Sequence, residues 1–115
     1  MTKPGFGVPA PPMAGPAAVP STTLAVVATN ARLDRPQTTK LAAMAQNGLA
    51  RAISPVHTLF DGDAVFGVSL GTQSADLNPL GSVAAEAVAA AIVRAVREAR
   101  SLGGVPALAD LGLLR

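Results

Sequence analysis

Apolar residues along this chain form two short runs, and a longer helical pattern follows each of them. Residues 22–30 (TTLAVVATN) are rich in β-branched residues and apolar on both alternating faces. Residues 64–70 (AVFGVSL) repeat this pattern. Runs of this kind are typical of strands that are covered on both sides. We therefore expect two buried strands.

Helix signals follow each predicted strand. Asp34 precedes Pro36 and Gln37, which together form a capping box with an early proline, and the helix should run to about residue 53, where Ser54-Pro55 ends it. After a loop over residues 71–81, Ser82 should cap a second helix that reaches about residue 101. The predicted order is strand, helix, strand, helix in an α/β (α+β layered) fold.

Proline and glycine divide the chain into three parts. Residues 1–21 form a Pro/Gly-rich leader that we expect to be disordered, residues 22–102 hold the predicted elements, and residues 103–115 form a Leu-rich tail. Two strands and two helices cannot cover one another, and two strands are not a stable sheet alone. We expect another chain, or more copies of this one, to complete the layers.

Composition removes several functional classes. The chain of 115 residues has no Cys, so it forms no disulfide or thiolate metal site, and its net charge of +2 comes from scattered basic residues that make no nucleic-acid footprint. The apolar stretch over residues 83–93 is interrupted by Glu86 and is shorter than a membrane span. We expect a cytoplasmic protein that does not bind membranes.

Ser21-Thr22-Thr23 is the first candidate for chemistry, because hydroxyl residues stand where the leader meets the strand. One interpretation is an ordinary strand edge, since Thr is favoured in strands. The other is self-cleavage between Ser21 and Thr22. The Thr22 hydroxyl would attack the Ser21 carbonyl, and the freed amine would then serve as the base for that hydroxyl.

Asp61-Gly62-Asp63 is the second candidate. Its residues suit a turn before a strand, and two carboxylates at this spacing are too few for a calcium loop. The same carboxylates could orient a nucleophilic hydroxyl and stabilise an ammonium group, which is compatible with the turn. His57, the only histidine, has no triad-like spacing, and we favour a structural or loop role for it. No nucleotide motif is present, so we expect no cofactor.

Several blocks in order resemble the C-terminal part of the DmpA-type aminopeptidases. They are TTLAVVATNA (22–31), GLARAI (48–53), PVHT (55–58) and DGDAVF (61–66). This family of N-terminal nucleophile hydrolases includes β-peptidyl aminopeptidases, L-aminopeptidase/D-esterases and 6-aminohexanoate-oligomer hydrolases. Its members split themselves into an α and a β chain, by autoproteolysis, within a four-layer αββα sandwich.

The resemblance implies a role for each candidate residue. Thr22 would be the nucleophile and the first residue of the β chain, and Asp61 and Asp63 would be the two carboxylates beside it. The chain would then be a β-subunit-like portion that needs an α-chain-like half to hydrolyse small peptides or amides, without metal or cofactor. An alternative is a non-catalytic subunit that docks on a related hydrolase or oligomerises. An acyltransferase of the same fold is a third, less favoured hypothesis.

Overall fold

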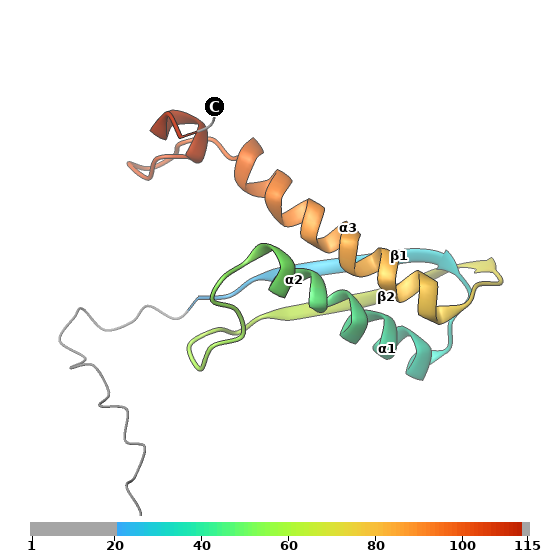
Figure 1. The fold of residues 1–115 in the computed structure, drawn as a ribbon. Coiled ribbons are helices and arrows are strands. Elements are labelled where there is room, and N and C mark those ends of the chain that lie inside the picture. Colours follow the sequence, from blue (N-terminus) through green and yellow to red (C-terminus); the bar gives the residue numbers. More distant parts are fainter. Residues whose placement is uncertain (1–20, 114–115) are drawn as a thin grey trace, which may run out of the picture.

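The computed structural model describes residues 21–113, which form a two-stranded sheet with helices packed on one of its faces (Figure 1). The mixed α/β class and the order strand, helix, strand, helix are confirmed. The predicted leader, apart from Ser21, lies outside the described residues. The elements are β1 (Leu24–Ala31), α1 (Arg35–Ala45), α2 (Asn47–Ala52), β2 (Ala64–Gln73), α3 (Leu77–Glu98) and the short 3-10 helix η1 (Leu108–Leu111).

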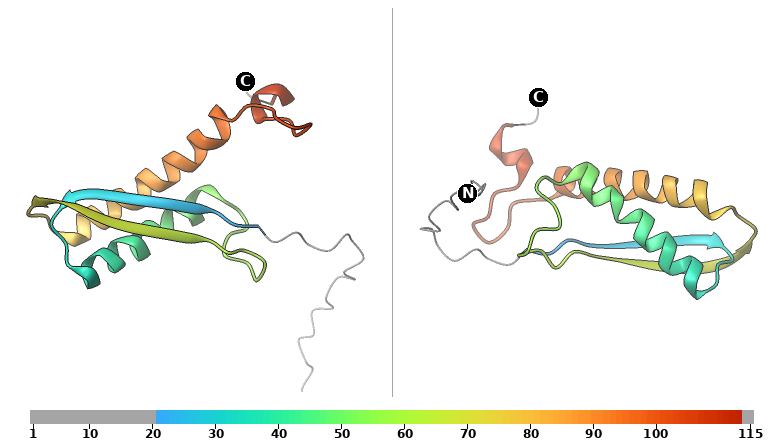
Figure 2. Two further views of the ribbon diagram at one scale, coloured as in Figure 1. Left: turned by 180° about the vertical axis from the view of Figure 1, so that it is seen from behind. Right: turned by 60° about the horizontal axis from the view of Figure 1, so that its bottom comes forward.

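The two strands run parallel, with Leu24 paired to Ala64 and Val26 paired to Phe66. Successive side chains of β1 point to opposite faces, as they must in a strand. Val27 packs against the helices, whereas residues Leu24 and Val26 are 68% and 67% exposed. Seen from behind, the strands lie in front of the helices, and no described segment covers them (Figure 2). The described chain therefore covers its strands on one face only, and burial of the second face by another chain stays a prediction.

The first helix begins as the sequence predicts. The Asp34 carboxylate accepts from the Gln37 N–H at 2.8 Å, and the Gln37 side chain accepts from the Asp34 N–H at 2.9 Å. The single helix expected as far as residue 53 is instead broken at Gln46 into α1 and α2. At this break the Leu49 N–H binds the Gln46 carbonyl, three residues back rather than four, which tightens the turn.

Helix α3 begins earlier than expected, and the predicted cap at Ser82 is wrong. Asp76 caps the helix by accepting from the Asn78 N–H at 2.9 Å, so the helix has 22 residues. Pro79 fits this early start, because the first turn of a helix needs no N–H donor. Of the described helices, α3 alone is long and apolar enough to cross a membrane by length and composition, contrary to the sequence estimate. A core helix has the same composition, and α3 packs on α1 and α2.

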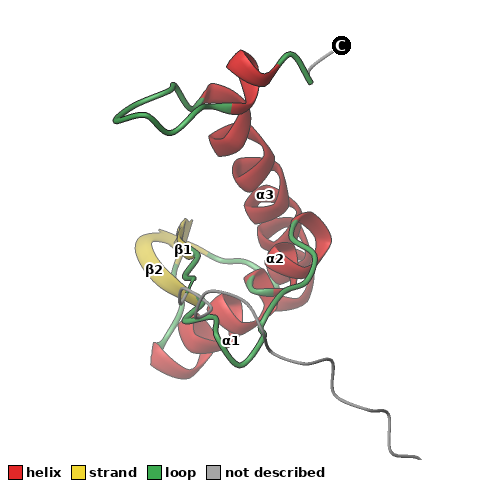
Figure 3. Cartoon of the chain, turned by 90° about the vertical axis from the view of Figure 1, so that its left-hand side faces the viewer, coloured by secondary structure: helices red, strands yellow, loops and turns green. Residues whose placement is uncertain are grey.

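The core lies between the helices and the covered face of the sheet. It is built from small and medium aliphatic side chains: Leu41, Ala45, Leu49, Ala84 and Val88. The helices approach closely where Gly48 of α2 faces the Ala85 carbonyl and Val88 of α3. In side view, one helical layer covers one side of the sheet, and the later turns of α3 extend beyond it (Figure 3). The core thus fixes the sheet from one side only.

Candidate active site at the starts of the two strands

The candidate residues from distant parts of the sequence meet where the two parallel strands begin. Ser21 and Asp61 form a parallel bridge just ahead of the regular pairing. The Gly62 N–H donates to the Ser21 carbonyl at 2.9 Å, and the Ala64 N–H donates to the Thr23 carbonyl at 3.0 Å. The backbone around Thr22 is therefore tied directly to the Asp-Gly-Asp segment.

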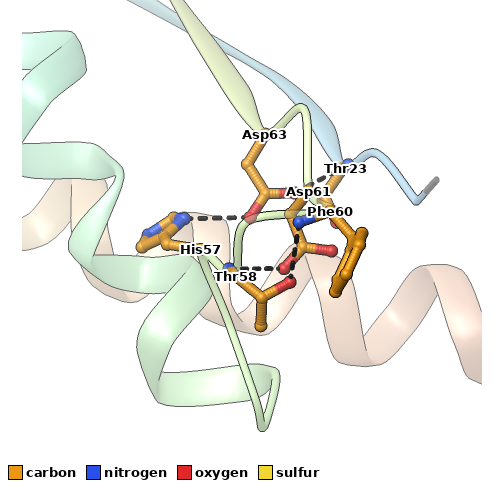
Figure 4. A network of polar contacts seen from close by, with 6 residues as sticks. All are labelled: Thr23, His57, Thr58, Phe60, Asp61 and Asp63. Carbon is orange, nitrogen blue, oxygen red and sulfur yellow. Dashed lines mark hydrogen bonds and ion pairs between the residues drawn. The ribbon is translucent and has the colours of Figure 1, made fainter. Parts of the chain in front are cut away.

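Asp63 points toward the helix side of the sheet, where its side chain is only 7% exposed. One carboxylate oxygen accepts from the Thr23 N–H at 3.0 Å, and the other lies 2.9 Å from His57 Nδ1 (Figure 4). Desolvation acts to raise the pKa of Asp63. The hydrogen bonds from Thr23 and His57, with the attraction of the imidazole charge, outweigh it and hold this pKa below its ordinary value of 3.8.

Asp61 closes the turn before β2. Its carboxylate accepts from the Thr58 N–H at 2.7 Å, and its own N–H donates to the Thr58 carbonyl at 3.1 Å. Phe60 N–H donates to the Thr58 hydroxyl within the same turn at 3.3 Å (Figure 4). The segment therefore forms the turn that its sequence suggests. Within that turn, Asp61 is the residue paired with Ser21.

The Thr22 side chain lies on the other face of the sheet from Asp63. It is exposed, and its hydroxyl sits beside Gly62: a Cβ added at Gly62 would lie 2.8 Å from Thr22 Oγ1. In the described part of the chain, no hydrogen bond joins this hydroxyl to Asp61 or Asp63. The structure brings both aspartates to the backbone flanking Thr22, but not onto the hydroxyl itself.

Sequence reasoning missed the link between His57 and Asp63. His57 has a backbone φ of 54°, in the left-handed region that a non-glycine residue rarely adopts. Such a conformation persists only where surrounding contacts hold it, and it occurs often at functional sites. A clue was available in the sequence, because a turn-rich segment of only five residues separates the histidine from the aspartate. Such a short segment can fold back and bring their side chains together.

A hollow of about 300 Å³ with a mixed polar and apolar lining lies on the helix side of this cluster. Its lining includes Asp61, Asp63 and Thr58, with Ile53 and Pro55 as the apolar wall. Within residues 21–113, no group of three or more His, Asp or Glu side chains is placed to hold a metal ion. The site collects hydroxyl, carboxylate and imidazole groups, a set typical of hydrolases that use a side-chain nucleophile.

Comparison with known proteins assigns the chain more narrowly. The profile of Peptidase family S58 matches residues 7–108, and the chain belongs to this family of peptidases. The resemblance to the DmpA-type aminopeptidases is confirmed, and with it the hydrolase class. The match begins within the Pro/Gly-rich segment, so most of that segment belongs to the family sequence.

Relatives in mycobacteria carry the name "uncharacterized aminopeptidase". The one from Mycobacterium leprae is 38% identical over 75% of this chain and 28% of its own length. Those from Mycobacterium tuberculosis and Mycobacterium bovis are each 33% identical over 79% of this chain and 31% of their own length. The chain thus spans about 30% of these relatives. No solved structure matched the chain significantly.

Proposed function

We propose that this chain is the β-subunit-like portion of a threonine-type N-terminal nucleophile hydrolase, acting as an aminopeptidase on short peptides, β-peptides or related small amides. Thr22 is the nucleophile, released as a free amino terminus by cleavage after Ser21. The main support is the geometry at the strand starts, where Asp61-Gly62-Asp63 is hydrogen-bonded to the backbone on both sides of Thr22.

In this mechanism the free α-amine of Thr22 takes the proton of its own hydroxyl, which then attacks the substrate carbonyl. Asp61 and Asp63 orient the new terminus and stabilise its ammonium form. The hydrogen bond from Thr23 to Asp63 supports this role, because it fixes the residue next to the nucleophile. The Asp63 carboxylate is charged at neutral pH, as a partner for an ammonium group must be, and its lowered pKa keeps that charge to a more acidic pH.

The remaining part of the enzyme is an α-chain-like half that completes a four-layer αββα sandwich. Two observations support this assembly. The sheet face that carries Leu24 and Val26 is exposed and apolar, and an apolar groove of about 930 Å³ lies between β1 and α3. The α half would complete the substrate pocket around Thr22 and supply donors for the oxyanion formed on the substrate.

Matched threonine variants test the proposal. The chain is produced together with an α-like segment from a relative, and its amino-terminal residue and the hydrolysis of amino-acid anilides are measured. Thr22→Ala should stay uncut and inactive, whereas Thr22→Ser should be cut and partly active. Thr23→Ala, which changes the neighbouring hydroxyl on the other face, should be cut like the parent. An active Thr22→Ala chain would refute the mechanism.

The alternative is a non-catalytic subunit that docks on a related hydrolase through the same apolar face. This interpretation shares the exposed Leu24 and Val26 but needs no cleavage. This alternative would be favoured if the chain binds an α-like partner, keeps its full length, and the activity of the complex is the same with the parent chain and with Thr22→Ala.

A further inference from the structure

Ser21, the residue before the proposed cleavage point, is held at both of its backbone polar groups. Its N–H donates to the Phe60 carbonyl at 3.2 Å, and its carbonyl accepts from the Gly62 N–H at 2.9 Å. These two bonds belong to the parallel bridge between Ser21 and Asp61. The peptide bond that joins Ser21 to Thr22 is therefore fixed against the segment that leads into β2.

We propose that the backbone N–H of Gly62 is a catalytic group for self-cleavage, because it binds the oxygen of the carbonyl that Thr22 attacks. This inference rests on the proposed function. Attack turns that carbonyl oxygen into an oxyanion, and a donor already directed at it stabilises the charge without rearrangement. The N–O separation to the unreacted carbonyl is 2.9 Å, so the donor is already in contact with the oxygen that takes up the charge. This donor belongs to the chain itself.

The step is an acyl shift from nitrogen to oxygen, followed by hydrolysis. The Thr22 Oγ–Ser21 C bond forms, the Ser21 C–Thr22 N bond breaks, and the hydroxyl proton ends on the Thr22 nitrogen. Water then attacks the ester, which gives the Ser21 carboxylic acid and restores the Thr22 hydroxyl. Solvent supplies the water, and no other co-reactant is needed.

Two features suit Gly62 to this role. It has no side chain, and an added Cβ would come within 2.8 Å of Thr22 Oγ1, so any other residue would crowd the attacking hydroxyl or displace it. Its N–H is also held in place, because Asp61 immediately before it is tied twice to Thr58, through its carboxylate at 2.7 Å and its N–H at 3.1 Å. Asp61 is accordingly a positioning residue for this donor.

The sharpest test replaces one N–H by oxygen. The chain can be assembled from two synthetic pieces by ligation at a temporary Cys that replaces Ala52. Because the natural sequence has no cysteine, that one Cys can afterwards be desulfurised selectively to Ala. One version carries an ester in place of the Gly62 amide. The matched control carries an ester in place of the Ala64 amide, whose N–H donates to the Thr23 carbonyl at 3.0 Å. Each version loses one bond of the same ladder, but only the first loses the bond to Ser21.

Intact mass followed over time in the full-length chain, together with the α-like segment, gives the cleavage rate. Loss of one oxyanion donor slows such reactions by about 100- to 1,000-fold. We expect that decrease for the Gly62 ester and a rate near that of the parent for the Ala64 ester. Equal rates for the two esters would overturn the proposal.

A second measurement does not depend on cleavage. In a Thr22→Ala chain labelled with ¹³C at the Ser21 carbonyl, the infrared carbonyl band should move to higher frequency with the Gly62 ester and stay in place with the Ala64 ester. An unmoved band in both would also overturn the assignment of the donor. Cleavage of the Thr22→Ala chain would instead refute the proposed function, so the two failures are distinguishable.

Discussion

Adjacent valines of β1 give a direct test of which sheet face a second layer covers. Val26 points away from the helices and is 67% exposed, whereas Val27 packs against the core of Leu41, Leu49 and their neighbours. The substitutions Val26→Glu and Val27→Glu introduce the same carboxylate one residue apart in the same strand. They therefore have the same chemistry and similar strand propensity, and differ only in the face.

The magnitudes follow from burial. Full burial of a valine side chain is worth about 1.5–3 kcal/mol. Since Val26 is 67% exposed, roughly two thirds of that, about 1–2 kcal/mol, is still to be gained when its face is covered. In the lone chain, Val26→Glu should change the free energy of unfolding by less than about 1 kcal/mol. Val27 is partly buried against the core, so Val27→Glu brings a charge into that contact and should cost several kcal/mol, a large share of the stability of a small domain.

The assay has two parts. Urea unfolding followed by circular dichroism compares the lone chains, and size-exclusion chromatography with an α-like segment compares their assembly. Val26→Glu should fold like the parent and fail to assemble, whereas Val27→Glu should be strongly destabilised. The reasoning is refuted if Val26→Glu unfolds the lone chain as Val27→Glu does, or if it assembles as well as the parent.

Two further predictions concern the helix contact and the site. Gly48→Ala should lower stability by about 1–2 kcal/mol in thermal unfolding. An added Cβ would meet the rigid Ala85 carbonyl and Val88, so its crowding should cost about 2–3 kcal/mol, the upper part of the usual range, against a gain in helix propensity of about 1 kcal/mol. A variant as stable as the parent would contradict this. The pKa of Asp63 is lowered in the folded chain, so its contribution to stability is present above the unfolded value near 3.8 and is lost as the pH falls through the folded value. Asp63→Asn should therefore be less stable than the parent at pH 7 and lose less stability than the parent between pH 5 and pH 2; an equal acid loss in urea titrations would count against the role of this carboxylate.

Features of the fold that depend on neighbouring residues were predictable from the sequence, whereas features that depend on contacts between distant residues were not. The start of α1 was predictable because Asp34 and Gln37 satisfy each other's backbone groups within one turn. The start of α3 was not, because Asp76 and Ser82 are both acceptable caps and the choice depends on how the helix packs. The break at Gln46 lies two residues before Gly48, where the chain approaches α3 closely, a contact between residues far apart in the sequence.

The site shows the same division. That Thr22 and the Asp61-Gly62-Asp63 segment lie together follows from their places just before two parallel strands. The contact between His57 and Asp63 depends on the left-handed backbone of His57, which residue type alone does not indicate. The opposite facing of Thr22 and Asp63 follows from strand alternation, but only once the register of the two strands is known.

The ladder bonds on either side of the Ser21–Thr22 bond have a practical consequence. Ser21 and Thr23 are each attached by bonds of their own to the segment that leads into β2, so after a cut Ser21 would still have its two backbone bonds to Phe60 and Gly62. Denaturing electrophoresis would show the two pieces, and native chromatography over time would show how long these bonds keep them together. The fresh carboxylate on Ser21 would also lie beside Asp61 and repel it. High salt should therefore slow the departure of the first fragment.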